Sequence, residues 1–228
     1  MRKEQDKMAL ESIKQDNVAA AAGYIREIAE IEKICGIPFF AYQIILEVKR
    51  ESKGKDKIIV IIPRYVAGLV GNPTIESIKR NCEGKKLLVM GTVQTLREYD
   101  TGKTLMFILA SFSKVVEHPL LQNDVLIRGI VARKPHYRIT PKGKRITELY
   151  ILSGSQLAKG MCQIPCICWG QQAEDAKNYK KWDVVELTGR YQSREYTKVI
   201  DETTGETEKR TAREISVREM RRVKHDRE

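Results

Sequence analysis

The chain has 228 residues, and its 41 lysines and arginines against 30 aspartates and glutamates give a formal net charge of +11. This length allows one large domain or two small ones, and the basic balance favours an anionic partner, either nucleic acid or an anionic membrane. No run of about 18 apolar residues is present, which excludes a membrane-spanning helix. Five cysteines form an odd set, which excludes a fully paired disulfide framework and indicates a reducing cytosol.

Alternating apolar and polar residues in the first half predict five β-strands, because successive side chains on a strand point to opposite faces. The predicted strands span residues 17–34, 39–48, 58–63, 87–99 and 105–116. A connector with about one helical turn is expected between the third and fourth strands. Residues 1–16 are expected to form an N-terminal arm.

The second half repeats this plan after a linker expected at 119–123. Its predicted strands span residues 124–133, 146–152, 161–169, 184–196 and 209–221, with a helix at 171–179. The sequence therefore predicts two domains, 17–118 and 124–223, followed by a basic C-terminal end at 224–228.

Short fragments recur in the same order in both halves, which predicts two copies of one fold. They are Gly23 and Gly129, Ile62-Pro63 and Ile164-Pro165, and the segments 91–99 and 189–196, at offsets of 106, 102 and 98 residues. Loops of different length would absorb the drift between these offsets.

Two predicted strands of the second half carry side chains suited to single-stranded nucleic acid. On the strand at 161–169, small apolar residues occupy one face and the opposite face ends in Trp169. On the strand at 184–196, guanidinium groups, an amide and an aromatic ring share a face, at Arg190, Gln192, Arg194 and Tyr196. Bases stack on exposed rings and phosphates pair with cations, at about 1–3 kcal/mol per stacked base.

Three cysteines share the apolar face of the strand at 161–169, namely Cys162, Cys166 and Cys168. Tetrahedral zinc usually takes four ligands, and no fourth cysteine or histidine is nearby in the sequence. Since free cysteine packs as a small hydrophobic residue, we expect core thiols, with no metal and no cofactor.

Four motifs between residues 125 and 196, taken together, resemble the bacterial single-stranded DNA-binding protein (SSB) family. They are a glycine-containing first strand, the turn YRITPKG, the strand end IPCICWG and the strand GRYQSREY, in that order. The resemblance extends to the tandem OB-fold type of Firmicutes and their mobile elements. It implies an all-β fold of two tandem five-stranded OB-fold barrels, each with a short helix or connector between strands three and four.

The expected nucleic-acid contacts fall into three groups. The first consists of the two strand faces, with Trp169, Arg190, Gln192, Arg194 and Tyr196. The second adds Arg128 and a basic loop that commonly borders the ligand groove of an OB-fold, with Tyr137, Arg138, Lys144 and Arg145; an ordinary solvated loop is the alternative. The third lies in the first copy, with Arg97, Tyr99 and Tyr65.

The two copies are not equivalent. Alignment on Ile-Pro places Ala67 opposite Trp169, so the first copy lacks that ring. Residues 1–120 have 19 basic and 15 acidic side chains, and residues 121–228 have 22 and 15, which gives +4 and +7. The second copy is therefore the predicted binding copy. Trp182, outside these motifs, is expected to pack under the helix.

These features predict a non-enzymatic protein that binds and protects single-stranded DNA, largely independently of sequence, in replication or recombination. A protein–protein adaptor of the primosomal type, built on OB-folds, is the alternative. No carboxylate cluster, nucleophile–base pair or phosphate-binding glycine loop favours an enzyme. By analogy with the family, two barrels per chain predict a homodimer that supplies four, in the cytoplasm with the nucleoid, and with neither membrane nor small-molecule substrate.

Overall fold

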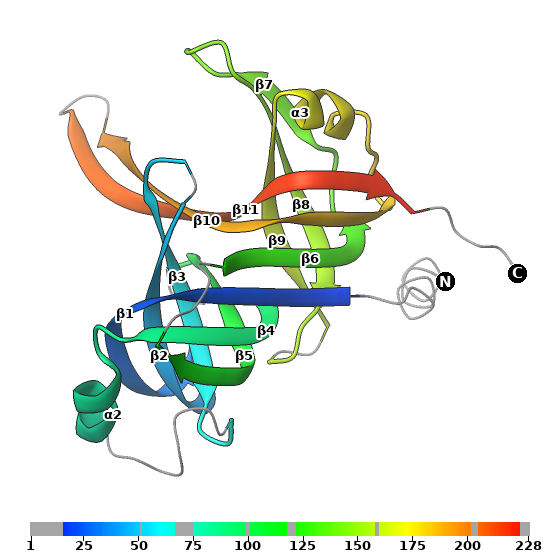
Figure 1. Ribbon diagram of the computed structural model, residues 1–228. Helices are drawn as coiled ribbons and strands as arrows, with labels where there is room; N and C mark the ends of the chain where they lie inside the picture. The colour runs from blue at the N-terminus through cyan, green and yellow to red at the C-terminus, as the bar shows by residue number, and fades with distance from the viewer. Residues whose placement is uncertain are drawn as a thin grey trace, which may run out of the picture.

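The computed structural model describes residues 16–50, 52–66, 75–98, 101–117, 122–157, 160–201 and 205–223 (Figure 1). The first half contains β1 (Asp16–Ile34), β2 (Ile37–Lys49), β3 (Lys55–Pro63), α2 (Ile75–Cys82), β4 (Lys86–Arg97) and β5 (Thr104–Val116). The second half contains β6 (Gln122–Val131), β7 (His136–Ile139), β8 (Arg145–Gly154), β9 (Met161–Trp169), α3 (Gln171–Ala176), β10 (Val184–Asp201) and β11 (Glu206–Arg222).

Each half closes into a five-stranded barrel with the same strand order. Barrel 1 runs β2-β3-β5-β4-β1 and closes through β1 and β2, with β3 and β5 parallel. Barrel 2 runs β8-β9-β11-β10-β6 and closes through β6 and β8, with β9 and β11 parallel. A helix lies between the third and fourth barrel strands in each case, α2 and α3. The predicted fold class, two tandem OB-fold barrels, is confirmed.

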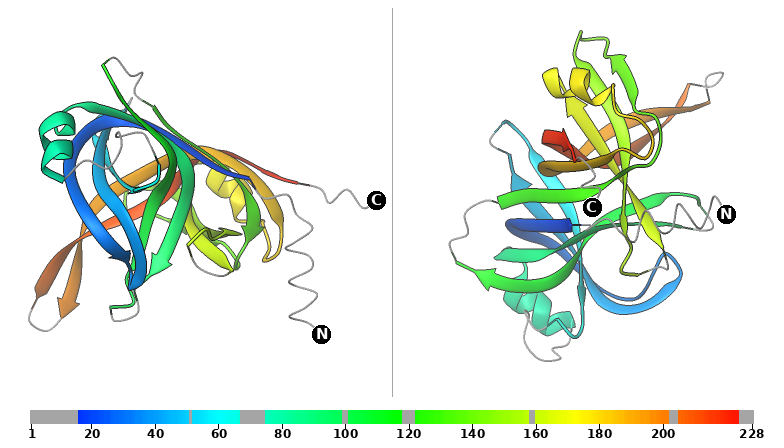
Figure 2. Two further views of the ribbon diagram at one scale, coloured as in Figure 1. Left: turned by 90° about the horizontal axis from the view of Figure 1, so that it is seen from below. Right: turned by 90° about the vertical axis from the view of Figure 1, so that its right-hand side faces the viewer.

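The first strands of the two barrels pair with each other. β1 and β6 run antiparallel, so all the described strands belong to one continuous eleven-stranded sheet (Figure 2). Ala19 pairs with Val125, 106 residues later, and this is also the separation of Gly23 and Gly129. The residue at the centre of the pairing therefore meets its own counterpart, which relates the barrels by an approximate two-fold axis.

The recurring glycines are explained by close backbone contacts. A Cβ on Gly23 would lie 2.4 Å from the carbonyl oxygen of Glu47, and one on Gly129 would lie 2.4 Å from that of Leu152. On the fourth strands, Gly91 and Gly189 each adjoin a β-bulge and face a carbonyl of the fifth strand in the same way. The glycine fragments thus occupy equivalent places in the two barrels. The predicted match of Ile62-Pro63 with Ile164-Pro165 is wrong, because the strand pairing places Ile62-Pro63 opposite Cys168-Trp169.

The main core runs through both barrels and includes the three cysteines of β9. Cys162, Cys166 and Cys168 are all buried, as predicted from their shared face. Burial raises the pKa of all three thiols, that of Cys168 to about 12. They are therefore neutral packing residues at physiological pH.

Several elements differ from the sequence-based expectation. Residues 136–139 form β7, which pairs with β8, so Tyr137 and Arg138 lie on a strand and not in a loop. The hairpin of β10 and β11 is longer than predicted, and α3 is shorter. Residues 122 and 123, expected in the linker, belong to β6. The N-terminal arm, the basic C-terminal end, Ala67 and Tyr99 lie outside the described residues.

The expected packing of Trp182 under the helix is wrong. Its side chain is 45% exposed, and the amine of Lys181 lies 4.8 Å from the ring centroid. The backbone φ of Trp182 is 79°, in the left-handed region, and the tight turn before β10 leaves the ring in solvent. Among the described residues, no helix is long and apolar enough to cross a membrane.

Candidate nucleic-acid interface

The predicted contact residues of the second half lie mainly on the outer face of barrel 2. This face spans β8, β9, β11 and β10, with the β7–β8 hairpin at one end and the long β10–β11 hairpin at the other (Figure 1). Trp169 ends β9 opposite Ile146 of β8, with its indole 36% exposed. The indole is therefore available for stacking at the end of this face.

Polar contacts bring Tyr137 and Arg145 together beside Trp169. The Tyr137 hydroxyl donates a 2.6 Å hydrogen bond to Oε1 of Glu174 on α3, and Arg145 Nη1 lies 3.5 Å from the same oxygen. The Arg145 carbonyl accepts a hydrogen bond from Gly170, the residue after Trp169. The bond to Glu174 raises the pKa of Tyr137, so its hydroxyl stays protonated.

Arg138 and Lys144 occupy the two sides of the β7–β8 turn. Arg138 Nη2 lies 2.9 Å from Oε1 of Glu148, which is on β8 and half-buried. Lys144 is exposed, and its backbone N–H donates to Oγ1 of Thr140 to hold the turn. The basic side chains of this hairpin are therefore close to the face but partly neutralised by its own carboxylates.

The predicted contact residues on β10 differ in exposure. Tyr196 is 38% exposed, and the Arg194 guanidinium carbon lies 5.6 Å from its ring centroid. Arg194 Nε also lies 3.3 Å from Oε1 of Glu214 on β11. Gln192 is only 6% exposed and donates to the same Glu214 oxygen. Arg194 and Tyr196 can thus meet a ligand, whereas Gln192 holds the carboxylate beneath them.

Arg190 lies between the barrels. Its Nη1 is 2.5 Å from Oδ2 of Asp56, a β3 residue that is 1% exposed. Asp56 also accepts hydrogen bonds from Arg50 and from the backbone N–H of Ser193. Burial lowers the pKa of Arg190 although Asp56 opposes this shift. The structure gives Arg190 a role between the barrels, which is not the role that the sequence predicts.

Arg128 lies on β6, the strand that joins the barrels. Its side chain is half-buried, and its Nε atom has no hydrogen-bond partner in the described part of the chain. β6 is not among the strands that carry the outer face with Trp169. Contact of Arg128 with nucleic acid therefore stays a prediction.

Residues 122–223, which form barrel 2, match the family described as "Single-strand binding protein family". This match covers 102 of the 228 residues, and it shows that barrel 2 is similar to that family. The curated single-stranded DNA-binding protein of Halalkalibacterium halodurans is 32% identical over 80 residues, which cover 32% of this chain and 48% of the relative. The chain thus spans about half the length of the curated relative that it matches.

Two solved structures of the single-stranded DNA-binding protein from Thermus aquaticus share the whole fold. The wild-type structure aligns with a TM-score of 0.68 at 16% identity, over 93% of this chain and 95% of that one. A deletion variant aligns with a TM-score of 0.66 at 17% identity, over 93% and 96%. At this identity the likeness concerns the fold, and it includes barrel 1, which lies outside the family match.

Barrel 1 has a different outer face from barrel 2. With Gly91 matched to Gly189, the register places Leu96 where barrel 2 has Arg194. With the bulges matched, Phe107 and Leu109 stand where barrel 2 has Glu214 and Ser216. These three residues belong to a second buried apolar cluster that also receives Leu157 from the β8–β9 connection. The outer face of barrel 1 is therefore a packing surface.

The same register corrects the expectation for Arg97. The similarity of the segments 91–99 and 189–196 matches Arg97 with Arg194, but the strand pairing places it opposite Glu195, on the other side of the strand. Arg97 is exposed at the end of β4. Tyr65 follows β3 and is 81% exposed, so its ring is accessible. The predicted alignment of Ala67 with Trp169 is wrong, because the strand pairing places Pro63 opposite Trp169.

Two asparagines that sequence reasoning missed hold the barrels in register. The Asn17 side chain accepts from the backbone N–H of Val93 and donates to its carbonyl, each at 2.8 Å. The Asn123 side chain does the same to Tyr191, at 2.9 and 2.7 Å. Both asparagines stand six residues before the first-strand glycine, and this spacing was the available sequence signal.

Proposed function

We propose that this chain binds single-stranded DNA without catalysing a reaction, and that barrel 2 supplies most of the contact surface. The observation that carries the proposal is the outward indole of Trp169, with Tyr137 and Arg145 beside it, in the barrel that matches the family. The relative from Halalkalibacterium halodurans and the two Thermus aquaticus structures are single-stranded DNA-binding proteins, which supports single-stranded DNA as the ligand. Protection of exposed strands during replication or recombination, in the cytoplasm with the nucleoid, is the role that follows.

In the proposed complex, bases stack on Trp169 and Tyr196 while the backbone crosses the face between them. Arg138, Arg145 and Arg194 each have a carboxylate partner in the free protein. Phosphates would therefore replace Glu148, Glu174 and Glu214 as the ion-pair partners of these three arginines. The arginine side chains of these pairs are 42–48% exposed, and ion pairs open to solvent contribute about 0–1 kcal/mol, so a phosphate can compete with them.

Tryptophan fluorescence provides the test, because the chain has only two tryptophans. Trp182→Phe leaves Trp169 as the sole reporter, and titration with oligo-dT should quench its emission. The logarithm of the binding constant should fall against the logarithm of salt concentration with a slope of about −0.7 per neutralised phosphate. Tight binding without quenching would show that the ligand binds away from Trp169. No binding at low salt would refute the proposal.

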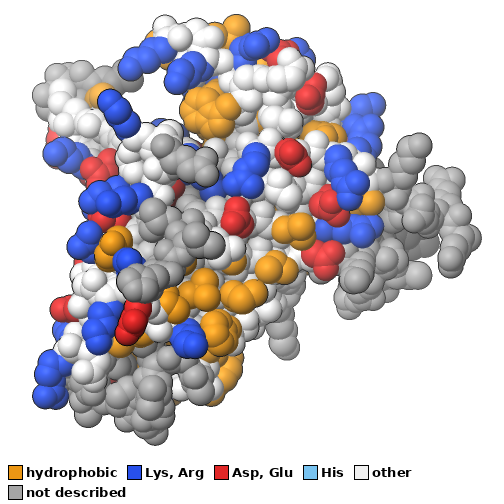
Figure 3. Space-filling view, in the orientation of Figure 1, with side chains coloured by type: hydrophobic (Ala, Val, Ile, Leu, Met, Phe, Trp, Pro, Cys, Tyr) orange, Lys and Arg blue, Asp and Glu red, His pale blue; other side chains and the backbone are white. Residues whose placement is uncertain are grey.

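We also propose that two chains associate through an exposed apolar strip. The strip crosses β5, β4, β1 and β6 and consists of Phe112, Met90, Val18 and Leu126, which are 44%, 45%, 48% and 38% exposed. Figure 3 shows apolar side chains gathered over this part of the molecule. The strip lies beside the two-fold axis between the barrels, so a second copy could match it symmetrically.

Light scattering coupled to size-exclusion chromatography tests this association. The unmodified chain should have the mass of a dimer, and Met90→Lys should give a monomer because it places a charge in the buried strip. Lys114→Glu, near the strip but outside it, should leave the dimer intact. A monomeric unmodified chain would contradict the proposal.

A further inference from the structure

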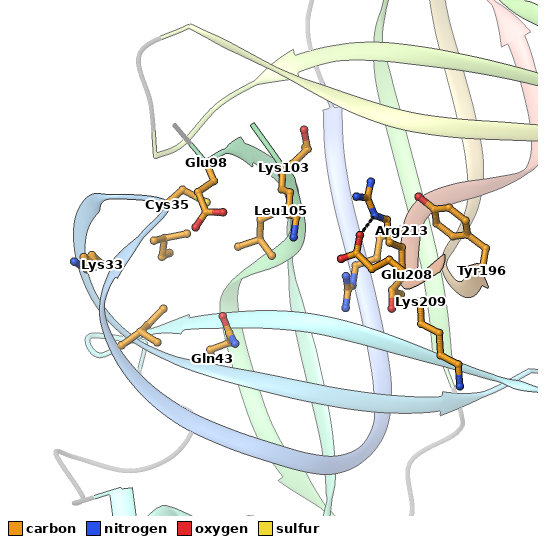
Figure 4. Close-up of a pocket in the computed structure, with 15 residues that line it drawn as sticks. Lys33, Cys35, Gln43, Glu98, Lys103, Leu105, Tyr196, Glu208, Lys209 and Arg213 are labelled. Atoms are coloured by element: carbon orange, nitrogen blue, oxygen red, sulfur yellow. Dashed lines mark hydrogen bonds and ion pairs between the residues drawn. The ribbon is translucent and has the colours of Figure 1, made fainter. Parts of the chain in front are cut away.

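A cleft of about 590 Å³ separates the β10–β11 hairpin of barrel 2 from one end of barrel 1. On the barrel 1 side it is lined by the turn between β1 and β2 and by residues around the β4–β5 turn. On the other side it is lined by Tyr196 and by β11 residues between Glu208 and Arg213. Figure 4 shows these two groups of side chains on opposite sides of the open space.

The cleft carries an excess of positive charge. Its lining has five basic side chains and two acidic ones, Lys33, Lys103, Lys209, Arg210 and Arg213 against Glu98 and Glu208. Glu208 is paired with Arg210 at 2.6 Å. Within the described residues, no ion pair occupies Lys33, Lys103 or Lys209, and the buried Nε of Arg213 has no hydrogen-bond partner. Cations from both sides thus line the cleft, with too few carboxylates to balance them.

The cleft also offers apolar and aromatic surface beside these cations. Ile31, Ile34 and Leu105 line its barrel 1 side and pack on the second apolar cluster. The Tyr196 ring lines the hairpin side and is exposed. A nucleotide presents the same combination, an anionic phosphodiester next to a flat and largely apolar base. A small inorganic anion would leave the apolar side without a partner.

We propose that this cleft binds a segment of single-stranded nucleic acid, which passes from the outer face of barrel 2 onto barrel 1. The phosphodiester lies against Lys103 and Lys209, which come from opposite sides, and against Arg213. A base lies between the Tyr196 ring and the apolar side of the cleft. This inference rests on the proposed single-stranded DNA binding, and it assigns barrel 1 a contact that its own packed outer face does not provide.

The competing interpretation is that the cleft is only a hydrated gap between the two barrels. The reactivity of the Cys35 thiol distinguishes this interpretation from the proposed binding site. Cys35 lines the cleft and is partly exposed, whereas Cys82, Cys162, Cys166 and Cys168 are buried. Burial and the nearby Glu98 carboxylate raise the pKa of Cys35, so alkylation needs a mildly alkaline buffer.

The experiment measures alkylation of Cys35 in the full chain by a maleimide, with and without saturating oligo-dT. Binding should slow the modification at least about tenfold, because the oligonucleotide fills the cleft. The chain carries Trp182→Phe, so that quenching of Trp169 is followed in the same sample. Quenching with unchanged Cys35 reactivity would overturn the cleft assignment and leave the proposed function intact, whereas neither effect would overturn both.

A charge-removal experiment tests the same site independently. Two oligonucleotides are compared, of about 8 and about 30 nucleotides, since one OB-fold covers about 4–16. Lys103→Ala combined with Lys209→Ala should weaken binding of the longer one about tenfold and reduce its salt slope by about 1.4. Binding of the shorter one to the Trp169 region should change less than twofold.

The matched control is Lys114→Ala combined with Lys181→Ala, which removes the same charge from exposed positions outside the cleft. This control should leave both oligonucleotides within twofold of the unmodified chain. Equal weakening by the two double variants would show an effect of net charge alone, and it would overturn the assignment. No weakening by the cleft variant would overturn it as well.

Discussion

At the scale of single residues, Trp169 is the side chain on which the proposed binding most depends. Loss of one stacked base costs about 1–3 kcal/mol, so Trp169→Ala should weaken oligo-dT binding by about 5- to 150-fold. Trp182→Ala removes the other exposed indole and should leave affinity within twofold. Fluorescence anisotropy of a labelled oligonucleotide measures both. Equal losses in the two variants would contradict the special position of Trp169.

Glu214 limits what Arg194 can contribute, because the two side chains are paired 3.3 Å apart on the proposed binding face. Glu214→Gln keeps the shape of the side chain and releases the guanidinium, so binding at low salt should tighten about two- to fivefold. In that variant, Arg194→Ala should reduce the salt slope by about 0.7, and in the unmodified chain by less. A salt titration of all four combinations measures this, and identical slope changes in both backgrounds would show that the pair does not matter.

At the scale of elements, the first strand of each barrel depends on one asparagine side chain. Asn17 and Asn123 continue the pairing with the fourth strand where the first strand turns away to join the other barrel. Replacing either by alanine leaves a backbone N–H and a carbonyl without partners and should cost about 1–3 kcal/mol. Urea unfolding measures the free energy, and similar losses for the two variants would follow from the two-fold relation.

Asn178→Ala is the control for this pair, because its side chain makes an exposed hydrogen bond to the Glu174 carbonyl. This change should stay within about 0.5 kcal/mol. A loss as small as this for Asn17→Ala and Asn123→Ala would mean that water replaces both side-chain amides at no net cost.

At the scale of the whole molecule, Asp56 ties the barrels into one unit. It lies between Arg50 and Arg190 with its carboxylate 1% exposed. Asp56→Asn preserves the shape but leaves two cations uncompensated, which should cost about 3–5 kcal/mol. Calorimetry should show one unfolding transition at a lowered temperature. Two separate transitions in the unmodified chain would contradict the idea of a single cooperative unit.

Glu186→Gln is the matched control for Asp56→Asn. Glu186 pairs with Arg221 on the surface, where the arginine side chain is 75% exposed. Loss of such a surface pair costs at most about 1 kcal/mol. A similar decrease in unfolding temperature for the two variants would show that burial of Asp56 does not make its ion pairs more important for stability.

The sequence by itself determined the local features of this protein. Period-two alternation placed Trp169 outside and the β9 cysteines inside, because a strand alternates its side chains whatever it pairs with. The recurring glycines indicated two copies of one fold, since each stands where another backbone approaches within van der Waals distance. These signals also predicted where the ten barrel strands lie along the chain.

Only the tertiary structure decided what individual polar side chains do. Arg190 has the spacing of a contact residue, yet its partner Asp56 is 134 residues away on the other barrel. Arg97 lies on the opposite face of its strand from the one predicted, because strand pairing, and not fragment similarity, determines the face of a residue. The cleft at Cys35 combines residues from both barrels, and a local sequence pattern cannot show that residues so far apart in the chain lie close together. Alternation shows which way a side chain points, but the packing of the two barrels determines what it meets.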